Sequence, residues 1–574
     1  MAAPIDWSRW DLYKREIEAC LRENFAPPRV AGGKGSAVEE ASRRLIKSGK
    51  VVVGKKTRGF LNQWLSVQTR RAKRGLEHRS PDWSHYRRVA AARVAPSSRV
   101  VERHILTAAQ NDVAVHTPFL ANLKALAAYY GARLHVGRFT YQVAYVAERA
   151  RRRGEATRAR DPVWAPELKG LLTSERVGLG DLLFCAEMNT LPTAVRPLSG
   201  LHTYGQGRTA IFPHAKVALE TVPTGGDATP PCVLTTGCCT IPSYSDTKAG
   251  HKGEFHHILG AVVVEVDADG RTFFRHVIGR PDGAFQDLDL LARDGRVVAG
   301  NRVEAITYGD LQLPFLDDGV ARATWGIDAD TLAPLADADD PMIDALKPRF
   351  GFYNDTVDFK SISHHDEKKP RERFRTYLNG GHLVESDISR AARFLVAAGR
   401  EWQKAVVVES NHDRWLERWL DRCDHRADRD NALAFLRWER ARMEAEARGE
   451  TDFNVFRHAL AEASGGNLPA EFVPEGGSFV ICQATGGVEC GAHGHLGPNG
   501  ASATPNALAR VSGKANIGDK HSPAIVDGLY VAGTSSKLRL GYNLGPSSWR
   551  HAHVIVYPTG KRALVFIDKG RWRA

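Results

Sequence analysis

RVEAITYGDLQ at residues 302–312, RFGFYNDTVD at 349–358 and AVVVESNHD at 405–413 share one pattern, a short apolar run that ends in polar residues. SFVICQA (478–484) and GLYVAGT (528–534) are further short apolar runs. Such runs, bounded by polar turns and separated by helical sequence, predict an α/β fold. In this fold class the residues that follow the strands converge outside the strand ends and carry the chemistry.

The chain is long enough for several domains, because 574 residues exceed what one hydrophobic core usually supports. The change to short strands near residue 301 predicts an α/β domain at 301–574. Residues 101–300 are predicted to form a mixed α/β domain whose fold the sequence leaves unresolved. Residues 1–100 are predicted to be basic and mostly helical.

The middle region contains two recognisable units. HILTAAQ (104–110), TPFLANLKALAAYYG (117–131) and ARLHVGRF (132–139) predict a strand, an amphipathic helix and a second strand. ILGAVVVEVDADGRTFFRHVIG (258–279) predicts a hairpin with Asp-Gly in its turn. RARRRGEATRARD (149–161) predicts an exposed basic loop or helix end.

The chain is basic, with a formal charge of +13 and a pI near 9.3. This charge favours polyanionic partners, of which nucleic acid is the commonest for a soluble protein, although a basic surface can also serve solubility alone. Short helices predicted at 9–24, 36–48 and 57–73 lie among clusters of Lys and Arg. They fit either a helix-turn-helix-like DNA contact or a solvated basic face, and the sequence leaves both interpretations open.

Several patterns are missing from the sequence. It contains no Walker loop and no GxGxxG, so a nucleotide-driven motor is not supported. It has no run of 18 apolar residues and no secretion signal at its start, which predicts a cytoplasmic protein without a membrane span. Its eight cysteines form no CxxC pair and are predicted to be reduced thiols.

Residues that commonly bind metals follow the predicted strands in a fixed order. They are Asp310, Gln312, Asp355, Asp358, Asn411, His412, His493, His495, Asp519 and His521. Each fragment alone is a weak signal, because an acidic residue or Asn after a strand often caps the next helix. Five fragments in one order, several of them directly after a strand, favour a metal site.

This ordered set resembles the calcineurin-like metallophosphoesterase family, whose pattern runs D-x-H, G-D-x-x-D, G-N-H-D/E, H and G-H-x-H. The resemblance covers roughly the last half of the chain and implies a four-layer α/β sandwich there. The segments DTVDFKSISHHD, ESNHDRW, HGHLGPNGA and HSPAIVDGLYVAGTS also resemble a group of tailed-bacteriophage early proteins. Those proteins are involved in DNA transfer and host DNA breakdown.

The resemblance implies a centre of two divalent metal ions. Asp310 and His521 would bind the first metal, with Gln312 standing where the family has His. Asp355 would bridge the two metals, and a water between them would become the attacking hydroxide.

The second metal would be bound by Asn411 and His493, with Asp519 standing where the family again has His. Gln312 and Asp519 both shift the site toward oxygen ligands, which suit Mn²⁺ or Mg²⁺ better than Zn²⁺. We therefore expect two divalent ions, with Mn²⁺ as the first choice and Mg²⁺ as the second.

His412 is the expected catalytic side chain. By the same resemblance it would approach the leaving-group oxygen or the phosphate, and Asp358 would hold its imidazole in position. A diester leaving group gains from a nearby proton donor, and this pair can supply that proton.

Other histidines lie near these motifs. His364 and His365 stand beside the basic stretch KKPRERFR (368–375), so they either contact substrate phosphates or belong to a surface loop without a role. His495 is expected to line the site. His551 and His553 are expected to be ordinary strand residues.

The function that these observations favour is a metal-dependent DNA nuclease, because basic segments flank a two-metal centre. It would be phage-encoded and act in the host cytoplasm in host DNA degradation or DNA transfer, with DNA as its partner and a homo-oligomer as a possible assembly. One alternative is a phosphomonoesterase on nucleotides or phosphoproteins, which predicts no salt-sensitive DNA binding. The other is a non-catalytic DNA-binding or DNA-transfer protein with a degenerate site.

A long helical stretch is predicted from residue 414 to residue 448. It carries Trp415, Trp419 and Trp438, whose expected use is core packing, and stacking on DNA bases is not assigned to them.

Overall fold

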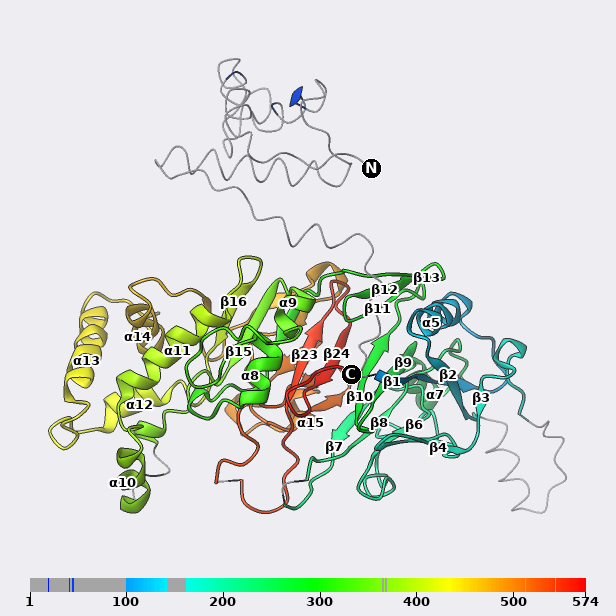
Figure 1. Ribbon diagram of the computed structural model, residues 1–574, viewed down its shortest axis with the longest axis horizontal. Coiled ribbons are helices and arrows are strands. Elements are labelled where there is room, and N and C mark those ends of the chain that lie inside the picture. Colours follow the sequence, from blue (N-terminus) through cyan, green and yellow to red (C-terminus); the bar gives the residue numbers. More distant parts are fainter. Residues whose placement is uncertain are drawn as a thin grey trace. The chain divides into compact units, whose positions relative to one another are not determined.

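Figure 1 shows the computed structural model of the chain. The structure describes residues 100–141, 162–226, 228–363, 366, 369–511, 513–541 and 543–574, together with the single residues 19, 41, 44 and 45. The chain divides into two compact units, Met1–Arg93 and Val94–Ala574. The helices predicted before residue 100 and the basic segment at 149–161 lie outside the described residues, and the domain boundaries at residues 100 and 300 stay predictions.

A six-stranded sheet forms the centre of the C-terminal half. Its strands, in spatial order, are β17 (Glu471–Val473), β16 (Lys404–Val408), β15 (Phe350–Asn354), β14 (Ala305–Thr307), β23 (Ala552–Val556) and β24 (Arg562–Phe566). Strands β14 to β17 pair in parallel, and β23 is antiparallel to both β14 and β24. The short apolar runs predicted near 305, 350 and 405 are therefore neighbouring parallel strands.

The two faces of this sheet pack against different layers. Ile306, Tyr353 and Val407 belong to a core cluster shared with helices on one face. The residues one position earlier, such as Phe352 and Val406, belong to a second cluster shared with Ile481 and Val488. Side chains alternate between faces along a strand, so these continuous apolar runs are buried on both sides.

A ten-stranded sheet covers the second face. Its strands, in spatial order, are β18 (Val480–Ile481), β19 (Val488–Glu489), β20 (Ala515–Ile517), β22 (Leu529–Val531), β21 (Ala524–Val526), β7 (Leu219–Thr221), β8 (Cys232–Thr235), β6 (Thr209–Phe212), β5 (Leu182–Cys185) and β4 (Arg176–Leu179). Strand β21 pairs with β7 through Ile525 and Leu219. Strands from both sides of residue 300 thus share one sheet.

The middle region contains the two predicted units. Strands β1 (Val100–Gln110) and β2 (Arg133–Phe139) pair in parallel around helix α5 (Thr117–Tyr130), which ends at Gly131 with a φ of 64°. Strands β9 (Gly260–Asp267) and β10 (Thr272–Ile278) form the predicted hairpin. These four strands and β3 (Leu172–Thr173) make a five-stranded sheet, and a separate small sheet contains β11 (Phe285–Asp287), β12 (Leu290–Arg293) and β13 (Arg296–Val298).

Helices α8 to α14 accompany the six-stranded sheet (Figure 1). The remaining α-helices of the described residues are α7 (Lys248–Phe255), α8 (Asp318–Trp325), α9 (Met342–Leu346), α10 (Pro370–Leu378), α11 (Val384–Ala398), α12 (Trp415–Arg422), α13 (Ala432–Ala447), α14 (Val455–Ala463) and α15 (Pro505–Leu508). The 3-10 helices are η1 (Pro166–Leu168), η2 (Leu313–Phe315), η3 (Lys360–Ile362), η4 (Gln483–Thr485) and η5 (Pro498–Gly500).

The predicted helical stretch from residue 414 is two helices, α12 and α13, separated by residues 423–431. Trp415, Trp419 and Trp438 are all buried, as the core-packing interpretation expects. Within the described parts of the chain, no helix has both the length and the apolar composition needed to cross a membrane.

Candidate metal centre

The site lies at the carboxyl ends of the parallel strands. Asp355 directly follows β15, and Asp310 follows β14 after two residues. Because these strands are neighbours, the two aspartates reach the same edge of the sheet. Strand β16 ends next to them and leads into the segment 410–413.

Backbone hydrogen bonds fix the loops that follow the strands. Leu311 N–H donates to the carbonyl of Asn354 over 3.0 Å, and Gln312 N–H donates to the carbonyl of Asp355 over 2.7 Å. Ser535 N–H, beyond the end of β22, donates to the carbonyl of Asp310 over 2.8 Å. Two chain segments that lie far from Asp310 in sequence therefore hold its loop.

Several candidate ligands have a left-handed backbone conformation, which non-glycine residues rarely adopt. The φ angles are 42° at Gln312, 46° at Asp355, 64° at Asp519 and 54° at His521. Such strain clusters at functional sites, where the surrounding structure enforces it. Four of the candidate ligands therefore share a backbone conformation that the surrounding structure must enforce.

Asp310, Asp355 and His521 form a buried group that can hold a metal ion. One ligand atom of each lies within 4.8 Å of the others. His521 Nε2 is 3.0 Å from Asp310 Oδ2 and 3.9 Å from Asp355 Oδ2. Two carboxylates and an imidazole at this spacing can surround one cation.

Buried polar atoms at this place have no hydrogen-bond partner among the described residues. They are Asp310 Oδ1 and Oδ2, Asp355 Oδ1, Asn411 Oδ1 and His493 Nε2. The imidazoles reach ion-pair distance of the carboxylates but lack hydrogen-bond geometry. An unsatisfied buried polar group is costly, so a cluster of electron-pair donors in this state fits one or more cations.

The pKa shifts of Asp310 and Asp355 also indicate that positive charge stabilises this group. Burial raises the pKa of Asp310, and His521 opposes that rise. Burial would also raise the pKa of Asp355, but His493 and His412 hold it well below its usual range. Positive charge at this place therefore favours the ionised form of Asp355.

His493 extends the cluster toward Asp519. Its Nε2 lies 3.3 Å from Asp355 Oδ1 and 3.6 Å from Asp519 Oδ1. Its Nδ1 lies 3.4 Å from Asn354 Oδ1, which orients the ring. Asp355 is therefore close to both His521 and His493, as a bridging ligand must be.

His412 and Asp358 form a pair beside this cluster. His412 Nδ1 is 3.2 Å from Asp358 Oδ1, and burial leaves the His412 side chain 17% exposed. Burial alone would lower the pKa of His412, but the carboxylates of Asp355 and Asp358 raise it to about 10. The imidazole can therefore carry a proton at neutral pH.

Asp413 ties the His412 loop to the loop that follows β15. Its carboxylate accepts hydrogen bonds from Ser410 N–H over 3.0 Å and from Val357 N–H over 3.3 Å. This side chain is fully buried. The sequence motif placed it beside His412 but did not reveal that it joins the two loops.

The remaining predicted site residues have different surroundings. The Oε1 atom of Gln312 accepts a hydrogen bond from Ser536 Oγ over 3.0 Å. His495 Nε2 is 2.8 Å from Glu475 Oε1, and its ring centroid is 5.3 Å from that of His493. His364 and His365 lie outside the described residues. The roles assigned to all these residues stay predictions.

Sequence reasoning missed the side chains that support the site from β23 and from the loop after β22. Gly309 N–H donates to His553 Nδ1 over 3.0 Å, and Thr324 Oγ1 lies 2.9 Å from His553 Nε2. Ser535 Oγ donates to the carbonyl of Gly309 over 2.8 Å. His553 is thus a strand residue, as expected, that also positions the backbone before Asp310.

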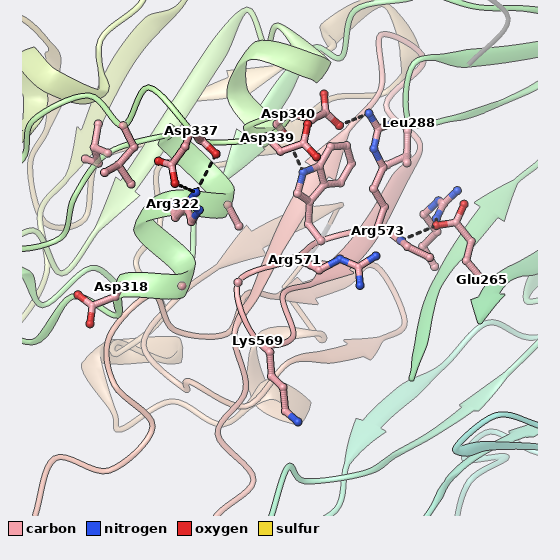
Figure 2. Close-up of a pocket in the computed structure, with 18 of the residues that line it drawn as sticks. Glu265, Leu288, Asp318, Arg322, Asp337, Asp339, Asp340, Lys569, Arg571 and Arg573 are labelled. Carbon is pink, nitrogen blue, oxygen red and sulfur yellow. Dashed lines mark hydrogen bonds and ion pairs between the residues drawn. The ribbon is translucent and has the colours of Figure 1, made fainter. Parts of the chain in front are cut away.

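A cavity of about 960 Å³ lies elsewhere, among α8, the segment 327–340 and residues 569–574 (Figure 2). Its arginines already have acidic partners, including Arg322 with Asp337 at 2.6 Å and Arg573 with Asp340. None of the predicted metal ligands lines it. This larger cavity is therefore separate from the candidate metal centre.

The fold and site define a mixed α/β protein with a buried Asp–Asp–His group that can hold a metal. The chain is 33% identical over 486 residues to Protein A1 of Escherichia phage T5, and the match spans 82% of this chain and 83% of that protein. It therefore belongs to the family of this phage protein. No family model matches the chain, and no solved structure matches it.

Gly518 provides a test of the cluster's geometry. A Cβ at this position would lie 2.1 Å from Asp310 Oδ1 and 3.2 Å from Asn354 Cβ. Gly518→Ala must therefore displace the Asp310 carboxylate, and we expect it to weaken Mn²⁺ binding by about 10- to 100-fold, as changes around metal ligands do. Isothermal titration calorimetry measures this affinity.

The matched control is Gly178→Ala on β4, where an added Cβ meets no atom within 4 Å. We expect it to bind Mn²⁺ as the unaltered protein does. Equal affinity in the Gly518 variant would show that Asp310 is not a ligand.

Proposed function

We propose that this protein is a metal-dependent DNA nuclease that hydrolyses phosphodiester bonds at a dinuclear centre. The observation that carries the proposal is the set of buried, unsatisfied ligand atoms around Asp355, beside the His412–Asp358 pair. Membership of a phage protein family fits an action on DNA in the host cytoplasm, in host DNA degradation or DNA transfer. We also propose that roughly the last half of the chain forms a four-layer α/β sandwich and that the protein assembles as a homo-oligomer.

The residues present fit two divalent cations. Asp310 and His521 would hold the first, Asn411 and His493 the second, and Asp355 would contact both. Three carboxylates, with Asp519 included, do not fully neutralise two dications, so a net positive charge remains for an anionic phosphate. When bound, such ions stabilise charge on phosphoryl oxygens and lower the pKa of a water. Oxygen-rich ligands favour Mn²⁺ and then Mg²⁺.

His412 supplies the proton that the leaving group needs. Its Nδ1 is held by Asp358, so Nε2 is the ring atom that can reach substrate. As the bond from phosphorus to the leaving oxygen breaks, a proton moves from Nε2 to that oxygen, and the resulting neutral imidazole keeps its contact with Asp358. A positioned acid of this kind typically contributes about 10²- to 10⁴-fold to the rate.

Charge supports a polyanionic substrate. The whole chain carries a formal charge of +13. Near the site, α10 contributes Arg373 and α12 contributes Arg418 and Arg422. A basic surface beside a phosphate-cleaving centre gains affinity for DNA by releasing condensed counterions.

A cleavage assay tests this function directly. With Mn²⁺ or Mg²⁺ the protein should degrade linear duplex DNA, and EDTA should stop it. Asp355→Ala should reduce cleavage below detection, because both metals lose a shared ligand, and His412→Ala should slow it by about 10²- to 10⁴-fold. Both variants should still bind DNA in a filter or anisotropy assay.

His251→Ala is the control, since His251 is exposed on α7 and pairs only with Asp246 among the described residues. It should cleave normally. DNA binding without cleavage under any metal would favour a non-catalytic DNA-binding protein. Release of phosphate from nucleotides, without salt-sensitive DNA binding, would favour a phosphomonoesterase.

Metal affinity should depend on pH through His521. Burial alone would lower the pKa of His521, but its contacts with Asp310 and Asp355 raise it to about 9. Below this pH the metal-free imidazole keeps a proton that a metal must displace. We expect Mn²⁺ affinity to rise about tenfold per pH unit toward pH 9 and then to level off.

Calorimetry in buffers of different ionisation enthalpy measures the protons released on Mn²⁺ binding. The predicted result is release of about one proton that His521→Ala no longer shows. Proton release that is unchanged in this variant would remove His521 from the ligand set.

A further inference from the structure

A second cavity, of about 390 Å³, lies beside the candidate metal centre. It is formed by η3, α10 and α12. Its lining side chains include Lys360, Arg373, Tyr377, Trp415, Arg418 and Trp419. A cavity of this size is in the range that binds small ligands or single groups of larger ones.

This cavity shares a wall with His412. The ring of Trp415 stacks on the ring of His412, with centroids 4.6 Å apart and planes at 25°. Lys360, at the start of η3, follows Asp358 by two residues. The cavity therefore lies next to His412, the side chain proposed to face the leaving group, with Trp415 between them.

Three arginines that line the cavity have no ion-pair partner among the described residues. They are Arg373, Arg418 and Arg422. Of its acidic lining residues, Asp424 pairs with Arg426 and Asp366 pairs with Lys360. Asp430 lies 3.7 Å from His382 Nε2, and Asp428 accepts hydrogen bonds from the side-chain amide of Asn431. The three arginines distinguish this cavity from the larger cavity in Figure 2, where arginines are paired with aspartates.

The cavity also presents aromatic rings. Trp415 and Trp419 are 5% and 8% exposed, so only small parts of their indoles reach its surface. Tyr377 is 54% exposed and lies on α10, a helix without a single buried residue. In Figure 1, α10 lies next to α12. A helix that contributes nothing to the core is available to a ligand.

We propose that this cavity binds an unpaired nucleotide of the DNA strand, on the leaving-group side of the cleaved bond. The base would stack on Tyr377, and its flanking phosphates would contact Arg373, Arg418 and Arg422. Aromatic side chains stack on any base, and arginines contact phosphates in pairs of hydrogen bonds. The inference rests on the proposed nuclease function and names the form of DNA that the site receives.

Two pairs of variants on α10 test the cavity. Arg373→Ala/Tyr377→Ala removes two lining side chains, whereas Arg371→Ala/Phe374→Ala removes two exposed residues of the same kinds that do not line it. All four side chains lie outside the core, so both variants should fold. Fluorescence anisotropy with a short labelled single-stranded oligonucleotide, in EDTA to prevent cleavage, measures binding.

We expect Arg373→Ala/Tyr377→Ala, the lining variant, to weaken oligonucleotide binding by about tenfold or more. Arg371→Ala/Phe374→Ala, the control variant, should weaken it by less than about twofold. An abasic site placed in turn at each position of the oligonucleotide provides the sharper readout. At one position, loss of the base should weaken binding to the unaltered protein but should not weaken binding to the lining variant further.

Equal losses in the two variant pairs, or an abasic effect that persists in the lining variant, would overturn the proposal and leave the nuclease function standing. Selective loss in the lining pair, in a protein that cleaves no DNA under any metal, would instead support the nucleotide site and refute the nuclease.

Discussion

The site depends on electrostatic repulsion between buried carboxylates. Asp310 and Asp355 are both almost fully buried, and their oxygens lie close enough to share one cation. Two such anions in a low-dielectric interior would protonate or separate unless positive charge stood between them. In the protein alone, neighbouring imidazoles supply part of that charge, but both carboxylate oxygens of Asp310, Oδ1 of Asp355 and Nε2 of His493 have no hydrogen-bond partner among the described residues. The folded chain therefore forms a place that could hold a metal ion, and the left-handed backbone at Asp355 and His521 is a local cost of building it.

The surrounding fold keeps these carboxylates together by close backbone approach. Gly309 lies against Gly533 and Thr534, and Gly518 lies against the Asp310 carboxylate, at separations that leave no room for a side chain. The six-stranded sheet brings Asp310 and Asp355 to one edge, and the loops from β20 and β22 of the ten-stranded sheet bring His521 and Ser535 across it. Sheet packing is thus what places ligands from two separate sheets around one point, and the helices on the opposite face stabilise the strands that carry them.

The sequence predicted the local elements well, because strand and helix periodicity is a local property. The parallel strands at 305, 350 and 404, the helix Thr117–Tyr130 and the hairpin at 260–278 all lie where their patterns indicated. The pairing of β21 with β7 could not be predicted, because hydrophobic pattern does not say which distant strand is the neighbour. The motifs pointed to Asp310, Asp355 and His521 as one group. They did not point to His553 or Ser535, because each of these acts through a hydrogen bond to the backbone of Gly309, which lies far away in the sequence. The sequence pattern also did not predict the break between α12 and α13, because the pattern is helical on both sides of it.

The central claim is that Asp355 joins two metal ions. Electron paramagnetic resonance of the protein titrated with Mn²⁺ tests it most directly, because two manganese ions that share a ligand couple magnetically and a lone ion does not. The account predicts that the signal of the coupled pair grows to two ions per chain, and that Asp355→Asn binds fewer ions and shows no coupling. A spectrum of isolated Mn²⁺ only, or one that Asp355→Asn leaves unchanged, would contradict it.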